Sequence, residues 1–208
     1  MGAGPCGEIR FRPQTGDYVI AADGGLKHLE KAGIHADRVV GDFDTLGYEP
    51  EHENVVRLQV MKDWTDTFVA MEKGVELGYG NFLFYGCLGG RLEHTAANLQ
   101  HLAWLAERGL TGWMYGEDRW VTAVCASPAK SASLVFSGEA EGGPQAGKLI
   151  SVFSLSDRSE GVTIKGLKYQ LQDAELTSGF PLGVSNEFTG ENAEISLKKG
   201  ILLVITEE

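Results

Sequence analysis

The stretch YVIAADGGLKHLEKAGIHADRVVGDFD, residues 18–44, predicts a strand, a helix and a second strand in succession. Residues 18–22 form an apolar run typical of a strand, and residues 24–33 have the apolar spacing of a short helix that ends at Gly33. Residues 38–41 form the next apolar run and predict another strand. Strands that alternate with helices favour a parallel sheet covered by helices.

The same alternation continues to about residue 127. Further strands are expected at 54–60, 81–86, 113–116 and 120–126, and further helices at 65–77 and 91–109. We therefore predict an α/β domain over residues 1–127, with a Rossmann-like parallel sheet and helices on both of its faces. Such a sheet normally has one more strand before residue 18, for which residues 1–17 offer only a short candidate.

Beyond about residue 128, the helical period gives way to short strand-like runs separated by Gly, Ser, Asn and Asp. This pattern predicts a C-terminal antiparallel β-sandwich over residues 128–208. Residues 139–148 are expected to form an exposed loop, and residues 198–200 to close a final hairpin.

Composition restricts the possible partners of the chain. The net charge is −11 and no basic cluster is visible, which disfavours duplex nucleic acid as a ligand. No apolar run approaches the ~20 residues of a membrane helix, and the N-terminus has no apolar stretch of signal-peptide length. The cysteines are Cys6, Cys87 and Cys125, which lack metal-binding spacing and are expected to be reduced thiols in a cytoplasmic protein.

Polar residues with binding chemistry follow four successive predicted strands. Asp23 follows the first, Asp42 and Asp44 the second, Asp63 and Asp66 the third, and the segment 89–91 (Gly-Gly-Arg) the fourth. Ligands of open parallel sheets bind beyond the carboxyl ends of the strands, so these residues are expected to meet at one edge.

Asp42 and Asp44 point to the same side of an extended backbone, because they are two residues apart. Carboxylates this close repel each other unless a cation or proton lies between them, and hard oxygen ligands suit Mg²⁺. A solvated Asp-rich turn is the alternative interpretation of this pair.

The other strand ends also have two interpretations. Asp63 suits the N-cap of the helix at 65–77 or a nucleotide contact, and Asp66 suits a metal ligand or a first-turn charge facing the helix dipole. The Gly-Gly-Arg segment suits a phosphate site or a glycine-rich turn with a surface arginine. A polar stripe continues from Glu93 along the next helix, where His101 is expected at the surface.

Several known motifs are excluded. The haloacid-dehalogenase phosphatases carry DxDxT on the first strand of their domain, whereas Thr45 lies one place too early here and another strand precedes it. Neither GxxxxGK[ST] nor a strand-linked GxGxxG occurs, so P-loop and dinucleotide-binding interpretations lose support.

Taken together, the motifs resemble those of the thiamine pyrophosphokinase family over nearly the whole chain. They are AADGG (21–25), GDFDT (41–45), KDWTD (62–66), GCLGGRLEH (86–94), GLKY (166–169) and GVSNEF (183–188). The resemblance implies transfer of a pyrophosphoryl group from ATP to thiamine, a requirement for Mg²⁺, and a homodimer with a shared active site.

The resemblance also assigns roles to individual residues. Mg²⁺ is expected on Asp42, Asp44 and Asp66, which with Arg91 form the catalytic group. ATP contacts are expected from Asp23, Lys62, Asp63, Gly89, Gly90 and Arg91. Thiamine contacts are expected from Glu93, Tyr169, Ser185 and Asn186.

Three positions depart from the family pattern: Glu93 stands where the family has Asp, Thr45 stands where it usually has Ser, and the first strand is short or missing. Two other classes of function are alternatives: a metal-dependent phosphatase of small phosphorylated metabolites and a non-catalytic domain that binds a nucleotide or thiamine. The early Thr45 argues against the phosphatase, and the five aspartates with Arg91 argue against the pure binder.

Overall fold

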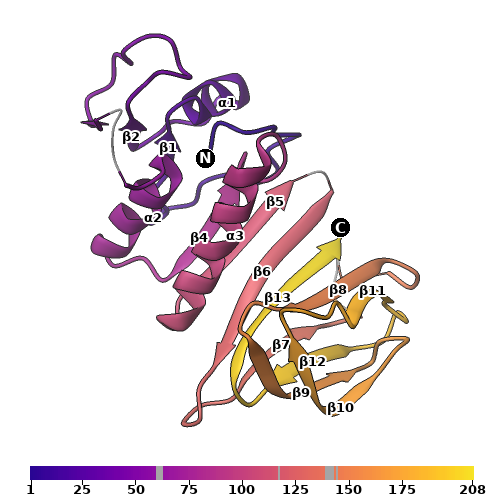
Figure 1. Ribbon diagram of the computed structural model, residues 1–208. Coiled ribbons are helices and arrows are strands. Elements are labelled where there is room, and N and C mark those ends of the chain that lie inside the picture. Colours follow the sequence, from indigo (N-terminus) through magenta and orange to yellow (C-terminus); the bar gives the residue numbers. More distant parts are fainter. Residues whose placement is uncertain (60–62, 117, 139–142, 144) are drawn as a thin grey trace. The chain divides into compact units, whose positions relative to one another are not determined.

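The computed structural model describes residues 1–59, 63–116, 118–138, 143 and 145–208 (Figure 1). The chain divides into two compact units, the first comprising residues 1–101 and 114–117 and the second comprising residues 102–113 and 118–208. Helix α3 (Leu92–Glu107) and strand β5 (Thr111–Gly116) each have residues in both units. The boundary at residues 127 and 128 was predicted from the loss of the helical period and stays a prediction.

The first unit contains the predicted parallel sheet. Its strands run in the order β1 (Ile20–Ala22), β2 (Arg38–Gly41) and β3 (Val55–Arg57). Helices α1 (Gly25–Ala32) and α2 (Asp66–Glu76) pack against this sheet, and Ala22, Val40 and Ala70 form a small buried core. The alternating pattern therefore predicted a parallel sheet covered by helices correctly, although among the described residues only the expected strands at 18–22, 38–41 and 54–60 have counterparts in it.

The ends of the two helices test the expected caps. Gly33 adopts a left-handed conformation with φ 66° and ends α1, as predicted. Thr65 caps α2, since its extended backbone lets the hydroxyl accept a hydrogen bond from the Phe68 N–H at 3.2 Å. The expectation that Asp63 caps this helix is therefore wrong, and Asp66 is the first helical residue.

The N-terminal residues take the place of the expected first strand. The Met1 carbonyl accepts a hydrogen bond from the Ala22 N–H at 2.8 Å, and the Gly2 N–H donates to the Tyr85 carbonyl at 2.7 Å. Residues 1–4 therefore bridge β1 and β4 (Asn81–Tyr85). Gly25 permits this approach, because a Cβ there would lie 2.2 Å from the Met1 carbonyl oxygen.

The second unit contains two antiparallel sheets. One has the order β10-β9-β12-β7, and in the other β11, β8, β13 and β6 lie side by side. The bounds are β6 (Arg119–Ala126), β7 (Ala132–Phe136), β8 (Leu149–Ser154), β9 (Arg158–Lys165), β10 (Leu171–Thr177), β11 (Gly183–Glu187), β12 (Ala193–Leu197) and β13 (Gly200–Glu207).

Side chains of both sheets form one core, which includes Ile150, Ile164, Ile195 and Leu202. This confirms the predicted sandwich. Because β12 and β13 belong to different sheets, residues 198–200 do not close a hairpin as expected. They cross between the sheets, and the Lys198 N–H donates to the Glu160 carbonyl at 3.0 Å.

Part of the expected loop at 139–148 lies outside the described residues, namely 139–142 and 144. Within the described ranges, no helix combines the length and apolar character needed to cross a bilayer.

Candidate active site

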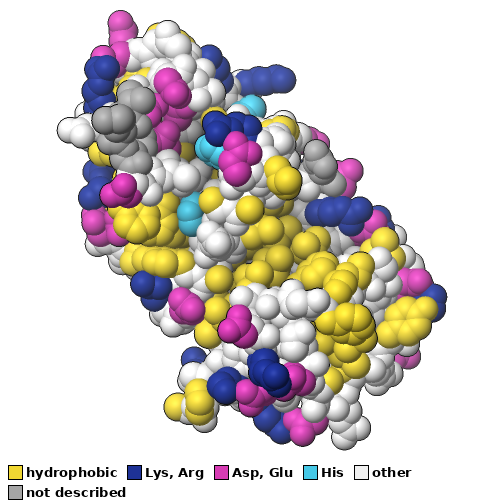
Figure 2. All heavy atoms as spheres, viewed as in Figure 1, with side chains coloured by type: hydrophobic (Ala, Val, Ile, Leu, Met, Phe, Trp, Pro, Cys, Tyr) yellow, Lys and Arg dark blue, Asp and Glu magenta, His cyan; other side chains and the backbone are white. Residues whose placement is uncertain are grey.

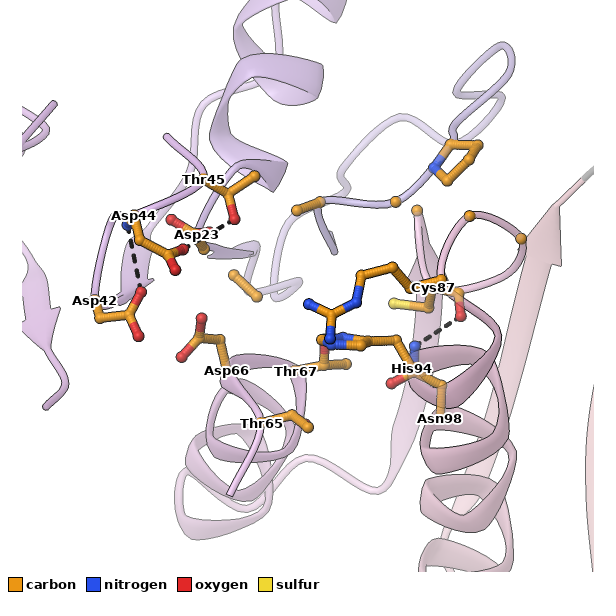
Figure 3. Close-up of a pocket in the computed structure, with 18 of the residues that line it drawn as sticks. Asp23, Asp42, Asp44, Thr45, Thr65, Asp66, Thr67, Cys87, His94 and Asn98 are labelled. Atoms are coloured by element: carbon orange, nitrogen blue, oxygen red, sulfur yellow. Dashed lines mark hydrogen bonds between the residues drawn. The ribbon is translucent and has the colours of Figure 1, made fainter. Parts of the chain in front are cut away.

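A cavity of about 600 Å³ opens in the first unit at the carboxyl ends of its strands (Figure 3). The loops after β1, β2 and β4 line it, together with the start of α2, the start of α3 and residues 3–5. The sequence predicted a site at this edge from its strand ends. It did not indicate that Ala3, Gly4 and Pro5 line the site, because they carry no ligand chemistry.

Three carboxylates meet at this cavity. Asp23 after β1, Asp42 after β2 and Asp66 at the start of α2 each offer an oxygen, and these oxygens all lie within 4.8 Å of one another. Three negative charges this close repel each other strongly unless a cation lies between them. Hard oxygen donors from short loops suit a divalent cation such as Mg²⁺.

Asp23 is held rigidly in this group. It is only 4% exposed, and its backbone adopts φ 47°, an unusual conformation for a non-glycine residue. Its N–H donates to the Val40 carbonyl at 2.8 Å, and its Oδ1 accepts from the Leu46 N–H at 3.4 Å. Gly41 lets β2 pass close by, since a Cβ there would lie 3.1 Å from the Asp23 Cα.

Asp44 lies beside this group in an exposed position. Its N–H donates to Asp42 Oδ1 at 3.3 Å, and its own Oδ1 accepts from the Thr45 hydroxyl at 3.0 Å. Figure 3 shows the side chains of all four aspartates on one side of the cavity. The sequence grouped Asp44 with Asp42 and Asp66, whereas the close group contains Asp23 in its place.

The glycine-rich loop borders the same cavity. Gly89 and Gly90 both have left-handed backbones, with φ 75° and 67°, and Arg91 follows them. The Arg91 Nε lies 2.7 Å from a Glu93 carboxylate oxygen, and both side chains are exposed. The pKa of Glu93 is lowered, first by a hydrogen bond from its own backbone N–H and then by Arg91.

Helix α3 contributes a polar stripe that is exposed at Glu93 and His94 and buried at Asn98 and His101. The Asn98 side chain donates to the Cys87 carbonyl at 2.7 Å, and both residues line the cavity beside His94 (Figure 3). His101 is 7% exposed, so the expectation that it lies at the surface is wrong. Burial lowers the pKa of His101 to about 4, so its ring is neutral near pH 7.

Two predicted ATP or thiamine contacts of the first unit do not line the cavity themselves. Neither Asp63 nor Glu93 is among the described residues that line it. Lys62 lies outside the described residues.

The predicted thiamine contacts of the second unit form a cluster of their own. Asn186 is 5% exposed, and its side-chain N–H donates to the Tyr169 carbonyl at 2.6 Å while its Oδ1 accepts from the Tyr169 N–H at 2.9 Å. The Oδ1 also accepts from the Glu187 N–H at 2.9 Å. The carboxamide thus holds the backbone that presents the exposed Tyr169 ring, and Ser185 lies next to it with φ 57°.

The chain is similar to two protein-family models and to a protein of Bacillus subtilis. Residues 13–113 match the family description "Thiamin pyrophosphokinase, catalytic domain", and residues 139–202 match "Thiamin pyrophosphokinase, vitamin B1 binding domain". A protein named thiamine pyrophosphokinase from Bacillus subtilis is 26% identical over 194 residues, which cover 89% of this chain and 85% of that protein.

Solved structures share the fold. The thiamin pyrophosphokinase of Geobacillus thermodenitrificans superposes with a TM-score of 0.79 at 24% identity, covering all of this chain and 95% of that one. The Candida albicans enzyme has a TM-score of 0.72 at 16% identity, covering 92% of this chain and 83% of that one. The two family matches span most of the sequence and include the aspartate-lined cavity, and the chain therefore belongs to the thiamine pyrophosphokinase family.

Proposed function

We propose that the cavity of the first unit is the site at which this ATP-dependent pyrophosphotransferase acts on ATP and thiamine. The observation that carries the proposal is the convergence of Asp23, Asp42 and Asp66, whose oxygens lie within 4.8 Å of one another. The glycine-rich loop and Arg91 line the same cavity and offer donors to phosphate.

The donor set fits Mg²⁺. Asp23, Asp42 and Asp66 would hold the ion, and Asp44 lies beside them, since its N–H donates to Asp42 Oδ1 at 3.3 Å. When bound, Mg²⁺ would offset the negative charge of the triphosphate beside these carboxylates. This ligand set differs from the set inferred from motifs alone, because Asp23 replaces Asp44.

The protein groups then position the reactants. The hydroxyl oxygen of thiamine forms a bond to the β-phosphorus of ATP, the bond from that phosphorus to the bridging α–β oxygen breaks, and AMP leaves with the bridging oxygen. The hydroxyl proton is lost in the same reaction. N–H groups of the loop at 89–91 and the guanidinium of Arg91 would orient the phosphates, since phosphoryl transfer depends mainly on alignment and charge stabilisation.

We assign thiamine recognition to Tyr169 and Ser185 of the second unit, with Asn186 as the residue that positions Tyr169. The Tyr169 ring is exposed, and an aromatic face suits the cationic thiazolium ring. Ser185 is also exposed, and its N–H donates to the Ser151 hydroxyl at 3.0 Å. Both residues can therefore reach a ligand outside the sandwich.

We further propose that the enzyme is a homodimer. Phe180, Leu182 and Val184 are exposed at alternate positions leading into β11, and β11 ends the strand order of its sheet. Figure 2 shows exposed hydrophobic side chains over this part of the second unit. An apolar edge strand of this kind favours pairing with a second copy.

We place the enzyme in the cytoplasm. Cys6, Cys87 and Cys125 are free cysteines, and burial raises the pKa of each thiol. Free thiols suit a reducing compartment.

The function is tested by incubating the protein with ATP, thiamine and Mg²⁺ and measuring all products. Thiamine diphosphate and AMP are expected in equal amounts, and chelation of the metal is expected to stop both. Free phosphate released without AMP would instead indicate a phosphatase. Thiamine binding without turnover at any Mg²⁺ concentration would indicate a non-catalytic binding protein.

A further inference from the structure

Trp64 is an aromatic residue of the cavity that has no role in the function described so far. Its side chain is 60% exposed even though it lines the cavity, and it lies two residues before Asp66. A large exposed indole loses the free energy of burial, about 25 cal/mol for each Å² left in water. Exposed aromatic surface inside a concave polar site is typical of a ligand contact.

A stack of rings holds Trp64 in place. The Phe68 ring stacks on the indole with a centroid distance of 4.8 Å and an interplanar angle of 21°. Phe68 is buried and contacts the His101 ring at 5.3 Å. Since His101 is buried and neutral near pH 7, this second contact is one between uncharged rings.

The start of α2 fixes the same segment. Thr65, the residue after Trp64, caps the helix. Its hydroxyl accepts a hydrogen bond from the Phe68 N–H, and the Phe68 ring stacks on the indole of Trp64. The cap and the ring stack therefore restrain Trp64 from two directions. A preorganised aromatic ring loses little conformational entropy when a ligand stacks on it.

From this geometry we infer that Trp64 is a stacking platform for a planar heteroaromatic ring of a substrate bound in the cavity. The identity of the ring rests on the proposed function, which supplies two sources: the adenine of ATP, or the pyrimidine and thiazolium rings of thiamine. Both have the flat π-face that an indole recognises, and the thiazolium adds a positive charge.

The inference is tested with Trp64→Ala, Trp64→Leu and Trp64→Phe. Stacking on an aromatic side chain is expected to change affinity by roughly tenfold or more, so Trp64→Ala and Trp64→Leu should raise one KM by that factor while kcat changes little. Trp64→Phe should restore most of the loss. A rise in the ATP KM identifies adenine as the ring, and a rise in the thiamine KM identifies thiamine.

Tyr48→Ala is the matched control, because Tyr48 is an exposed aromatic of the same unit that is not among the described residues lining the cavity. Unchanged KM values for both substrates in active Trp64→Ala and Trp64→Leu proteins would overturn the inference. Equilibrium dialysis of ATP and of thiamine separates this result from a failure of the proposed function. If the protein shows no turnover but the Trp64→Leu variant binds ATP or thiamine less tightly than the wild type does, the stacking platform is supported. If the variant and the wild type bind each ligand with the same affinity, the platform is refuted.

Discussion

The aspartates illustrate how single residues acquire roles through their neighbours. Asp42 and Asp44 follow the same strand and are two residues apart, yet Asp42 joins the close carboxylate group and Asp44 stays exposed beside it. Asp23 joins the group because its left-handed backbone and the nearby Gly41 bring it against β2. A short sequence motif does not reveal which aspartates join the group, because their positions depend on contacts between distant segments of the chain.

Asp23→Asn and Asp44→Asn separate the two possible ligand sets. We expect Asp23→Asn to lower kcat/KM by at least about a hundredfold and to raise the Mg²⁺ concentration needed for half-maximal rate, because it removes one charged ligand from the group. Asp44→Asn should have the smaller effect on the Mg²⁺ requirement. Steady-state rates over a Mg²⁺ titration give both values, and a larger shift for Asp44→Asn would support the set predicted from sequence.

His101 predicts a pH dependence of stability. Its pKa is about 4 in the folded protein and 6.5 in the unfolded chain, so the unfolded chain binds more protons between these values. Stability should therefore fall as the pH drops from 6.5 to 4, by on the order of 2–3 kcal/mol from this group.

Denaturant unfolding of the wild type and of His101→Phe at pH 7 and pH 4.5 measures this contribution. The variant keeps an aromatic ring against Phe68 but cannot take up a proton. It should lose less stability on acidification than the wild type. Parallel losses in the two proteins would show that His101 titrates normally.

At the level of helices and strands, the sequence was most informative where local chemistry decides the outcome. Gly33 ended α1 as predicted, because a left-handed residue at a helix terminus favours glycine. The start of α2 was harder, since Asp63, Thr65 and Asp66 are all acceptable caps and only the backbone conformation selects Thr65.

Thr65→Ala tests the cap of α2. Loss of the hydroxyl leaves the Phe68 N–H without this acceptor and should destabilise the protein by about 1 kcal/mol. Thr65→Ser keeps an acceptor and should recover most of that loss. Thermal or urea unfolding measures the difference, and equal stability of the Ala and Ser variants would show that the cap contributes nothing.

At the level of the whole molecule, the fold class and the division into an α/β part and a β-sandwich could be predicted from periodicity and motifs. Alternating strands and helices identified the parallel sheet, and the loss of helical period identified the sandwich. The burial of His101 and the bridging by residues 1–4 could not be predicted, because both depend on tertiary packing between segments far apart in the sequence.

The proposed dimer predicts an effect of charge at the edge of the sandwich. Leu182→Asp should shift the protein from dimer to monomer in sedimentation velocity, because a buried unpaired carboxylate opposes association. Leu77→Asp is the matched control, since Leu77 has similar exposure in the first unit. A wild-type protein that sediments as a monomer, or a Leu182→Asp protein that remains dimeric, would contradict this assignment.

The double hydrogen bond between Asn186 and the Tyr169 backbone has a consequence for the proposed thiamine contact. The Asn186 carboxamide binds both backbone polar atoms of Tyr169, so it restrains the main chain at this residue while the exposed phenol ring keeps its side-chain rotations. Movement of this ring is therefore expected from its own side-chain torsions rather than from a local shift of the main chain.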